Sequence, residues 1–164
     1  MAHKTACQGF TLIEVLIATI LVGLSIAALV GANASFTIAN GEGTDMSTAE
    51  FLVEQIRELT AMLPVLDPDT KDWFDAKEAS WASYDDVDDF DGFNSSSLGG
   101  PISANRTVLT EFAAFSQQVT VENVSASNLD QVVADKGSDF LRVTARVLQN
   151  GRQVVSASWI RAKY

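Results

Sequence analysis

Hydrophobic residues gather in one long run near the N-terminus. No charged residue occurs between Glu14 and Glu42, and residues 15–32 are almost wholly apolar. A helix needs about 20 such residues to cross a bilayer, so this run predicts a transmembrane helix. Lys4 is the only Lys or Arg before Arg57. A basic N-terminal flank predicts that the N-terminus faces the cytoplasm and that the bulk of the chain lies outside.

Beyond this run the pattern becomes that of an amphipathic helix. Apolar residues recur at intervals of three and four, at Ala49, Leu52, Val53, Ile56, Leu59, Thr60 and Leu63. Pro64 ends the pattern. Gly41 and Gly43 interrupt it, and Ser47-x-x-Glu50 has the form of a capping box. The sequence therefore predicts a kink or short break at residues 40–46.

The last third of the chain predicts an antiparallel sheet. Residues 119–124 alternate between apolar and polar. Residues 140–148 and 153–160 flank Asn150-Gly151, a strong hairpin signal. Pairing Gln149 with Arg152 would place Arg142 opposite Trp159. A cation–π contact there and simple packing on the strand surface are both open.

Composition and charge narrow the classes of function. The chain of 164 residues is 47% hydrophobic and has a formal net charge of −10. Its mean hydropathy is +0.13. Binding to phosphates requires clustered Lys and Arg, so no nucleic acid is expected as a partner. Cys7 and His3 are the only residues of their types. If the first nine residues are removed, no disulfide, Cys nucleophile, His base or Cys/His zinc site can form.

Three explanations compete for the N-terminus. An ordinary secretory signal could be cleaved after the small residues at 32–34, before Ser35. Against this, the flank before the apolar run is long and includes Glu14. A lipoprotein signal at Cys7 is discarded, because there the apolar region should precede the cysteine.

The third explanation is a resemblance. The segment from Gly9 to Val15, Gly-Phe-Thr-Leu-Ile-Glu-Val, resembles the cleavage motif of type IV pilin-like prepilins. The resemblance implies cleavage after Gly9 by a prepilin peptidase, N-methylation of Phe10, and a role in assembly for Glu14. A carboxylate inside a membrane span costs about 2.5–3.5 kcal/mol and is usually paired. Glu14 could pair with the new amine of Phe10, in its own chain or a neighbour, or could simply lie among the lipid headgroups.

The predicted fold class is α+β, with a long N-terminal transmembrane helix that continues into a pilin-like head. A C-terminal antiparallel sheet packs on the helix in this prediction. The expected parts are a leader peptide at 1–9, a transmembrane and assembly helix at 10–34, the second half of the helix at 35–63 with its break at 40–46, an acidic aromatic loop region at 64–101, and the antiparallel sheet at 102–164. Gly23 stands where pilins carry a helix-weakening glycine, but Gly31 stands where they carry a proline.

The loop region is rich in aspartate and in aromatic residues, which predicts that it packs against the head. The segment 84–90, Tyr-Asp-Asp-Val-Asp-Asp-Phe, resembles a segment of minor pilins of the mannose-sensitive haemagglutinin type. Candidate metal ligands are Asp86, Asp88, Asp89 and Asp91. Their oxygens suit Ca²⁺, but the spacing does not fit an EF-hand. A loop whose carboxylates accept backbone N–H bonds is the alternative. A two-carboxylate hydrolase site is a third explanation, but no other residues in the sequence suggest an active site.

The resemblance implies a structural subunit and not an enzyme: a minor pilin or a type II secretion pseudopilin. Its partners would be the prepilin peptidase, other pilin or pseudopilin subunits, and the bacterial inner membrane. The subunit would then move to a periplasmic or cell-surface filament. No cofactor is expected, with Ca²⁺ as the exception that the acidic loop leaves open. The alternative function is an anchored or exported calcium-binding, adhesive head.

Overall fold

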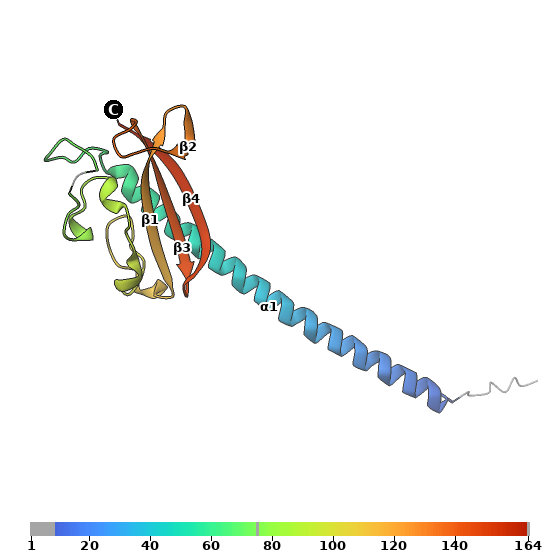
Figure 1. The fold of residues 1–164 in the computed structure, drawn as a ribbon. Helices are drawn as coiled ribbons and strands as arrows, with labels where there is room; N and C mark the ends of the chain where they lie inside the picture. Colours follow the sequence, from blue (N-terminus) through green and yellow to red (C-terminus); the bar gives the residue numbers. More distant parts are fainter. Residues whose placement is uncertain (1–8, 75, 164) are drawn as a thin grey trace, which may run out of the picture. The chain divides into compact units, whose positions relative to one another are not determined.

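The computed structural model describes residues 9–74 and 76–163. Within those ranges one α-helix, α1 (Leu12–Met62), precedes four short 3-10 helices and four strands (Figure 1). The 3-10 helices are η1 (Trp81–Ser83), η2 (Asp88–Phe90), η3 (Ser95–Ser97) and η4 (Thr110–Phe112). The strands are β1 (Phe115–Ser125), β2 (Asn128–Val132), β3 (Phe140–Gln149) and β4 (Arg152–Ala162). This architecture confirms the predicted α+β class.

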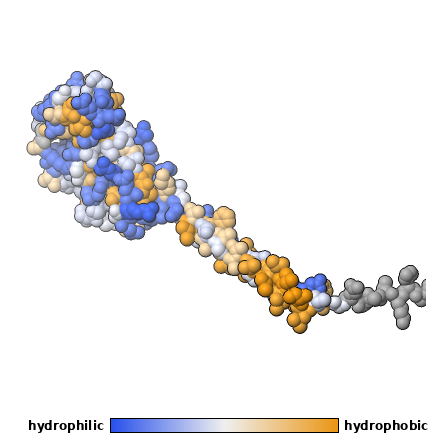
Figure 2. Space-filling model, turned by 45° about the vertical axis from the view of Figure 1, so that its right-hand side comes forward, coloured by the Kyte–Doolittle hydropathy of each residue, from blue (hydrophilic) through white to orange (hydrophobic). Residues whose placement is uncertain are grey.

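The chain divides into two compact units, Met1–Gly43 and Thr44–Tyr164. In the first unit every described residue is exposed, although most of them are apolar. Figure 2 shows this apolar surface in orange. By length and composition α1 could cross a membrane. A continuous apolar surface of this size requires lipid or a protein partner, since its exposure to water is costly.

The predicted break at residues 40–46 is wrong, because α1 includes all of them. Two glycines lower helix stability by about 1 kcal/mol each. They remove no backbone hydrogen bond, as a proline would, and a helix that is already nucleated on both sides can continue through them. Ser47 therefore does not begin a new helix. The helix ends at Met62, as Pro64 predicted.

In the second unit, the end of α1 packs on a twisted antiparallel sheet of strand order β2-β1-β3-β4 (Figure 1). The predicted apolar face of the helix is confirmed. Its buried residues are Ala49, Leu52, Val53, Ile56, Leu59 and Thr60. The apolar ones among them share one core with the inward side chains of the two central strands, among them Val119, Leu141 and Val147. The alternation predicted in β1 is confirmed, whereas β2, an exposed edge strand, was not predicted.

The predicted turn of the hairpin is confirmed, but the predicted register of its two strands is wrong. Asn150 and Gly151 both have positive φ, 50° and 81°, and Gln149 pairs with Arg152 as predicted. A bulge between Val147 and Leu148 then shifts every later pair by one residue.

The shift removes the predicted contact between Arg142 and Trp159. Trp159 lies opposite Val143, and its ring packs against the core. Arg142 instead forms an ion pair with Glu122 of β1, at 2.8 Å. In β4 the side that packs on the core therefore carries Val155, Ala157 and Trp159, and Ile160 faces outward.

The loop region between helix and sheet is packed down, as its aromatic content predicted. Trp73, Tyr84, Phe90 and Phe93 are buried. The Tyr84 and Phe90 rings meet edge to face, with centroids 5.1 Å apart.

The C-terminal end of α1 is capped from β4. Arg161 donates from Nη2 to the carbonyl of Leu63 at 2.9 Å and from Nη1 to the carbonyl of Thr60. The last turn of α1 has no basic residue of its own. Arg161 thus supplies both the hydrogen bonds and the positive charge that a helix C-terminus favours.

Replacing this arginine should weaken the head. Arg161→Ala is expected to lower the free energy of unfolding by about 2 kcal/mol, because two charge-assisted hydrogen bonds to half-buried carbonyls are lost. Arg161→Lys, which keeps the charge but not the fork of donors, should lose about half as much. Urea unfolding followed by tryptophan fluorescence measures both variants. Equal stability of wild type and Arg161→Ala would contradict the capping role.

Candidate functional site

The start of α1 is built by Thr11 and Glu14. The backbone N–H and the hydroxyl of Thr11 each donate to Glu14 Oε2 at 3.2 Å, and the N–H of Glu14 donates to Thr11 Oγ1 at 3.3 Å. This is a reciprocal capping box, which satisfies backbone donors that a helix N-terminus leaves free. The pattern Thr-x-x-Glu was readable in the sequence and was missed there. Glu14 therefore has a structural role in addition to its predicted role in assembly.

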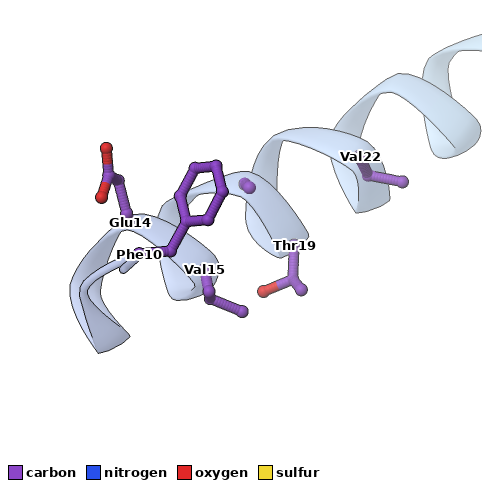
Figure 3. A pocket seen from close by; sticks show the side chains of 6 residues that line it. Phe10, Glu14, Val15, Thr19 and Val22 are labelled. Atoms are coloured by element: carbon purple, nitrogen blue, oxygen red, sulfur yellow. The ribbon is translucent and has the colours of Figure 1, made fainter. Parts of the chain in front are cut away.

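The residues around Glu14 form an open apolar groove on one face of the helix (Figure 3). Its lining residues are Phe10, Glu14, Val15, Ala18, Thr19 and Val22. The Phe10 ring lies along the helix in Figure 3, and the residue is 84% exposed. A single carboxylate beside an otherwise apolar groove can accept one cation next to an apolar partner. That is the chemistry expected for pairing with an amine.

The peptide bond between Gly9 and Phe10 lies outside the helix. Neither residue is assigned regular structure, and both are exposed. A Cβ placed on Gly9 would meet no atom within 4 Å. Exposed, irregular backbone is where peptidases cut most readily. Residues 1–8 of the predicted leader, with His3 and Cys7, lie outside the described residues.

The four aspartates predicted as metal ligands each accept a hydrogen bond from a different backbone N–H group. Asp86 accepts from the N–H of Asp89 at 3.1 Å, and Asp89 accepts from that of Asp85 at 3.0 Å. Asp88 accepts from the N–H of Phe74, and Asp91 accepts from that of Val121 at 2.9 Å. These bonds tie the loop to itself and to β1. They agree with the alternative prediction, in which the carboxylates of the loop accept hydrogen bonds from backbone N–H groups.

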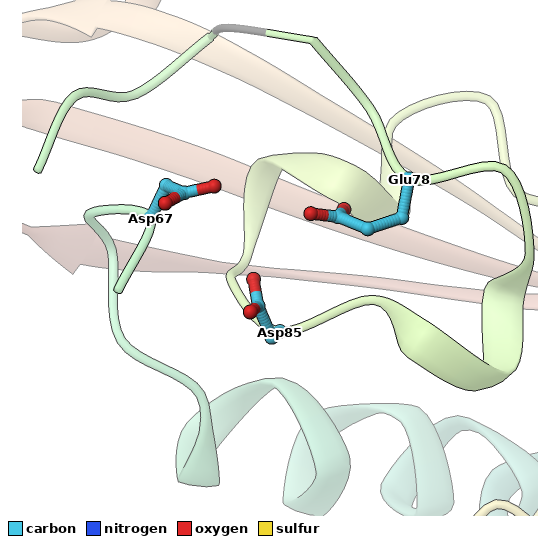
Figure 4. Close-up of side chains that lie close together, drawn as sticks. All are labelled: Asp67, Glu78 and Asp85. Atoms are coloured by element: carbon cyan, nitrogen blue, oxygen red, sulfur yellow. The ribbon is translucent and has the colours of Figure 1, made fainter. Parts of the chain in front are cut away.

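A different group of carboxylates comes together in space. Among the described residues, Asp67, Glu78 and Asp85 each place a carboxylate oxygen within 4.8 Å of the others (Figure 4). Glu78 Oε2 and Asp85 Oδ1 are buried atoms with no hydrogen-bond partner in the described chain. Asp67 is already held, because its Oδ1 accepts from the N–H groups of Asp69 and Thr70 at 2.6 Å each. Sequence reasoning missed this group because its members are far apart along the chain.

Crowding raises the pKa of several of these carboxyl groups. The pKa of Glu78 rises to about 7, chiefly through a shared hydrogen bond with Asp89 and then through burial. The pKa of Asp86 rises to about 8, because the side chain is buried and lies beside Asp88. Burial also raises the pKa of Asp85. The backbone N–H of Thr70 lowers the pKa of Asp67, in the opposite direction to the shifts of Glu78 and Asp85.

These raised values predict the pH dependence of the head. A carboxyl whose pKa is higher in the folded state binds its proton more tightly there, so stability falls as pH rises. For Asp86 the fall runs from its ordinary value of 3.8 up to about 8. Asp86→Asn mimics the protonated form. It should be more stable than wild type at pH 8, by on the order of 2 kcal/mol, with the two converging near pH 4.

The measurement is the melting temperature from pH 4 to pH 9, followed by tryptophan fluorescence. Asp69→Asn is the control. Asp69 is exposed, and its side chain takes part in none of the described hydrogen bonds; only its backbone N–H donates, to Asp67. Its melting curve should follow that of wild type. A parallel pH profile for Asp86→Asn and wild type would show that Asp86 does not carry the effect.

Comparison with known proteins bears on the N-terminal segment. Residues 4–30 match the family model described as the prokaryotic N-terminal methylation motif. The match includes Gly9, Phe10 and Glu14 and supports a type IV pilin-like prepilin. It points to a structural subunit and not to an enzyme, and it implies processing by a prepilin peptidase and assembly with other pilin subunits. Searches of curated proteins and of solved structures gave no match to this chain.

Proposed function

We propose that this chain is a minor pilin or pseudopilin, a structural subunit of a type IV pilus or of a type II secretion-like filament. One observation carries the proposal. The methylation motif at residues 4–30 leads directly into an exposed apolar helix surface for which the described chain supplies no cover. Such a surface is suited first to lipid and then to the apolar helices of other subunits.

In this proposal the subunit is inserted in the inner membrane with its N-terminus in the cytoplasm and its head outside. Cleavage after Gly9 creates an amine on Phe10, which is then methylated. The subunit leaves the bilayer for a periplasmic or cell-surface filament, where Glu14 pairs with the Phe10 amine of a neighbour. Among pilins, we favour the minor pilins of the mannose-sensitive haemagglutinin type, on the basis of the segment 84–90.

The decisive experiment is mass spectrometry of the mature N-terminus, from cells that contain a prepilin peptidase. The expected product begins with N-methylated Phe10. A product that begins at Ser35 would identify an ordinary secretory signal and end the pilin proposal. A chain that keeps Met1 in the presence of the active peptidase would contradict the processing step. Gly9→Val is the matched variant and should remain uncleaved.

The second candidate function is a calcium-binding head. It is favoured by the group of Asp67, Glu78 and Asp85, where two buried carboxylate oxygens have no hydrogen-bond partner among the described residues. Carboxylate oxygens at this spacing suit Ca²⁺. The cation would compete with the proton on Glu78, so binding should tighten as pH rises through about 7.

Calorimetry of the full-length chain in detergent, with Ca²⁺ added at pH 8, tests this candidate. Heat of binding and a higher melting temperature are expected. The double variant Glu78→Gln, Asp85→Asn should lose both effects, and the exposed neighbour Asp69→Asn should keep them. An absence of heat with wild type would remove the candidate and leave the pilin proposal intact.

A further inference from the structure

The two edges of the sheet differ in how they are protected. β2 forms one edge, has only five residues and carries Asp130. β4 forms the other edge and has 11 residues (Figure 1). Proteins usually keep an edge strand short, or place charges, proline or a bulge in it, because its free backbone groups can pair with another chain. After Val154, which the bulge leaves unpaired, residues 155–160 include no charged residue and no proline.

A groove lies directly beside this unprotected edge, between β4 and α1. Its volume is about 530 Å³, and β4 lines it with Val155 and Ala157, two side chains of the inner face. From α1 come the apolar side chains of Phe51 and Val53, and Phe51 is 47% exposed. Side chains alternate between the two faces of a sheet. A strand added to β4 would therefore place every second side chain over this groove.

The charge of the groove indicates which kind of strand fits. Among the described residues, its charged lining residues are Glu50 and Glu54, both exposed. They lie four residues apart on α1 and repel each other. Arg57 forms an ion pair with Glu54 at 3.4 Å, whereas Glu50 has no ion pair in the described part of the chain. A Lys or Arg of an incoming strand can therefore pair with Glu50 while apolar side chains beside it cover Phe51.

A second copy of this chain does not suit the site. Two β4 strands would pair antiparallel about a two-fold axis perpendicular to the sheet, which reverses every direction in the plane of the sheet. The part of α1 that packs on the sheet would then run in opposite directions in the two copies. Subunits anchored in one membrane enter it in the same direction, so this step rests on the proposed function. The other edge strand, β2, carries Asp130 and no basic residue.

We propose that β4 accepts an added strand from another protein, an extended segment with apolar side chains on its inner face and one Lys or Arg opposite Glu50. Backbone hydrogen bonds to the edge of β4 supply affinity, and the groove supplies specificity, as in other strand additions. The site belongs entirely to the second unit and does not require cleavage after Gly9.

Photo-crosslinking of the full-length chain, in the cells that naturally produce it, tests this proposal. The photoreactive residue p-benzoylphenylalanine replaces Ser156, which is exposed on β4, and mass spectrometry identifies the captured peptide. The expected product is an apolar segment of another protein with a Lys or Arg beside the captured residue. Glu50→Lys should lower the crosslinking yield more than about tenfold, because the groove would then repel the basic residue of the strand.

Glu58→Lys is the matched control. It makes the same change on an exposed part of α1 outside the groove, so the yield should stay at the wild-type level. Each variant is first shown to have the melting temperature of wild type. Three results would overturn the proposal: capture of a second copy of this chain, no capture above the yield obtained from Asp130 on β2, or equal yields from the two lysine variants. A different mature N-terminus would end the pilin proposal alone.

Discussion

A chain carrying Glu14→Val is expected to be cleaved after Gly9 as wild type is, but to enter filaments more than tenfold less often. Among the described residues, the Glu14 carboxylate is the only charged group that lines the groove formed with Phe10. Without it, the Phe10 amine of a neighbour would be buried in an apolar contact with no partner. An unpaired buried charge costs about 3–5 kcal/mol.

Two further variants separate the proposed pairing from capping, since Glu14 also caps the start of α1. Glu14→Gln keeps an oxygen that can accept from Thr11 but removes the charge, and should fail to assemble like Glu14→Val. Thr11→Val removes the hydroxyl of the capping box but keeps the carboxylate, and should assemble. The readouts are the mature N-terminus and the amount of subunit in sheared filaments. Normal assembly of Glu14→Gln would refute charge pairing.

Gln117→Leu is expected to have the largest effect on the stability of the head. The Gln117 side chain is fully buried and accepts from the N–H of Ile102 at 2.7 Å. It also donates to the carbonyls of Leu52 and Ile102, at 2.8 and 3.0 Å. One amide thus joins β1, the loop before it and α1. Leucine would remove these partners from the buried N–H and carbonyl of Ile102 and the second hydrogen bond from the Leu52 carbonyl, with an expected loss of about 3 kcal/mol in the free energy of unfolding.

Gln118→Leu provides the control for this prediction. Gln118 is the next residue of β1, is half-buried, and lies on the opposite face of the sheet. Its replacement should change stability by less than about 0.5 kcal/mol, as for other surface positions. Urea unfolding in detergent, followed by fluorescence of the tryptophans in the second unit, measures both. If both glutamine variants lost the same amount, the buried network would not be the cause.

The features that the sequence predicted well depend on local chemistry. The span, the core face of α1, the stop at Pro64 and the turn at Asn150-Gly151 each follow from a few neighbouring residues. The register of the hairpin does not, because the bulge at Val147/Leu148 responds to packing of Val155 and Trp159 on the core. The break at 40–46 was wrong because weak helix formers lower stability without forcing an end.

In the acidic loop, too, spacing along the sequence did not show which side chains meet in the folded protein. Asp86, Asp88, Asp89 and Asp91 were predicted as joint metal ligands, and each accepts a hydrogen bond from a different backbone N–H group. Their role as ligands stays a prediction. The group of Asp67, Glu78 and Asp85 comes from three separate positions along the chain, and only the folded loop brings these carboxylates together. The buried hydrogen bonds of Gln117 could not be predicted from the sequence either, because a single glutamine in an alternating strand does not indicate which groups it will bind.

The cap that Arg161 places on α1 has a consequence for the order of folding. Thr60 and Leu63 leave the ribosome about a hundred residues before the arginine that completes their helix turn. The last turn of α1 must therefore wait for β4, and a chain stopped before β4 would expose an uncapped helix end and the edge of β3 that does not pair with β1. Quality control by proteases should then separate complete from truncated subunits before any of them reaches an assembly machine.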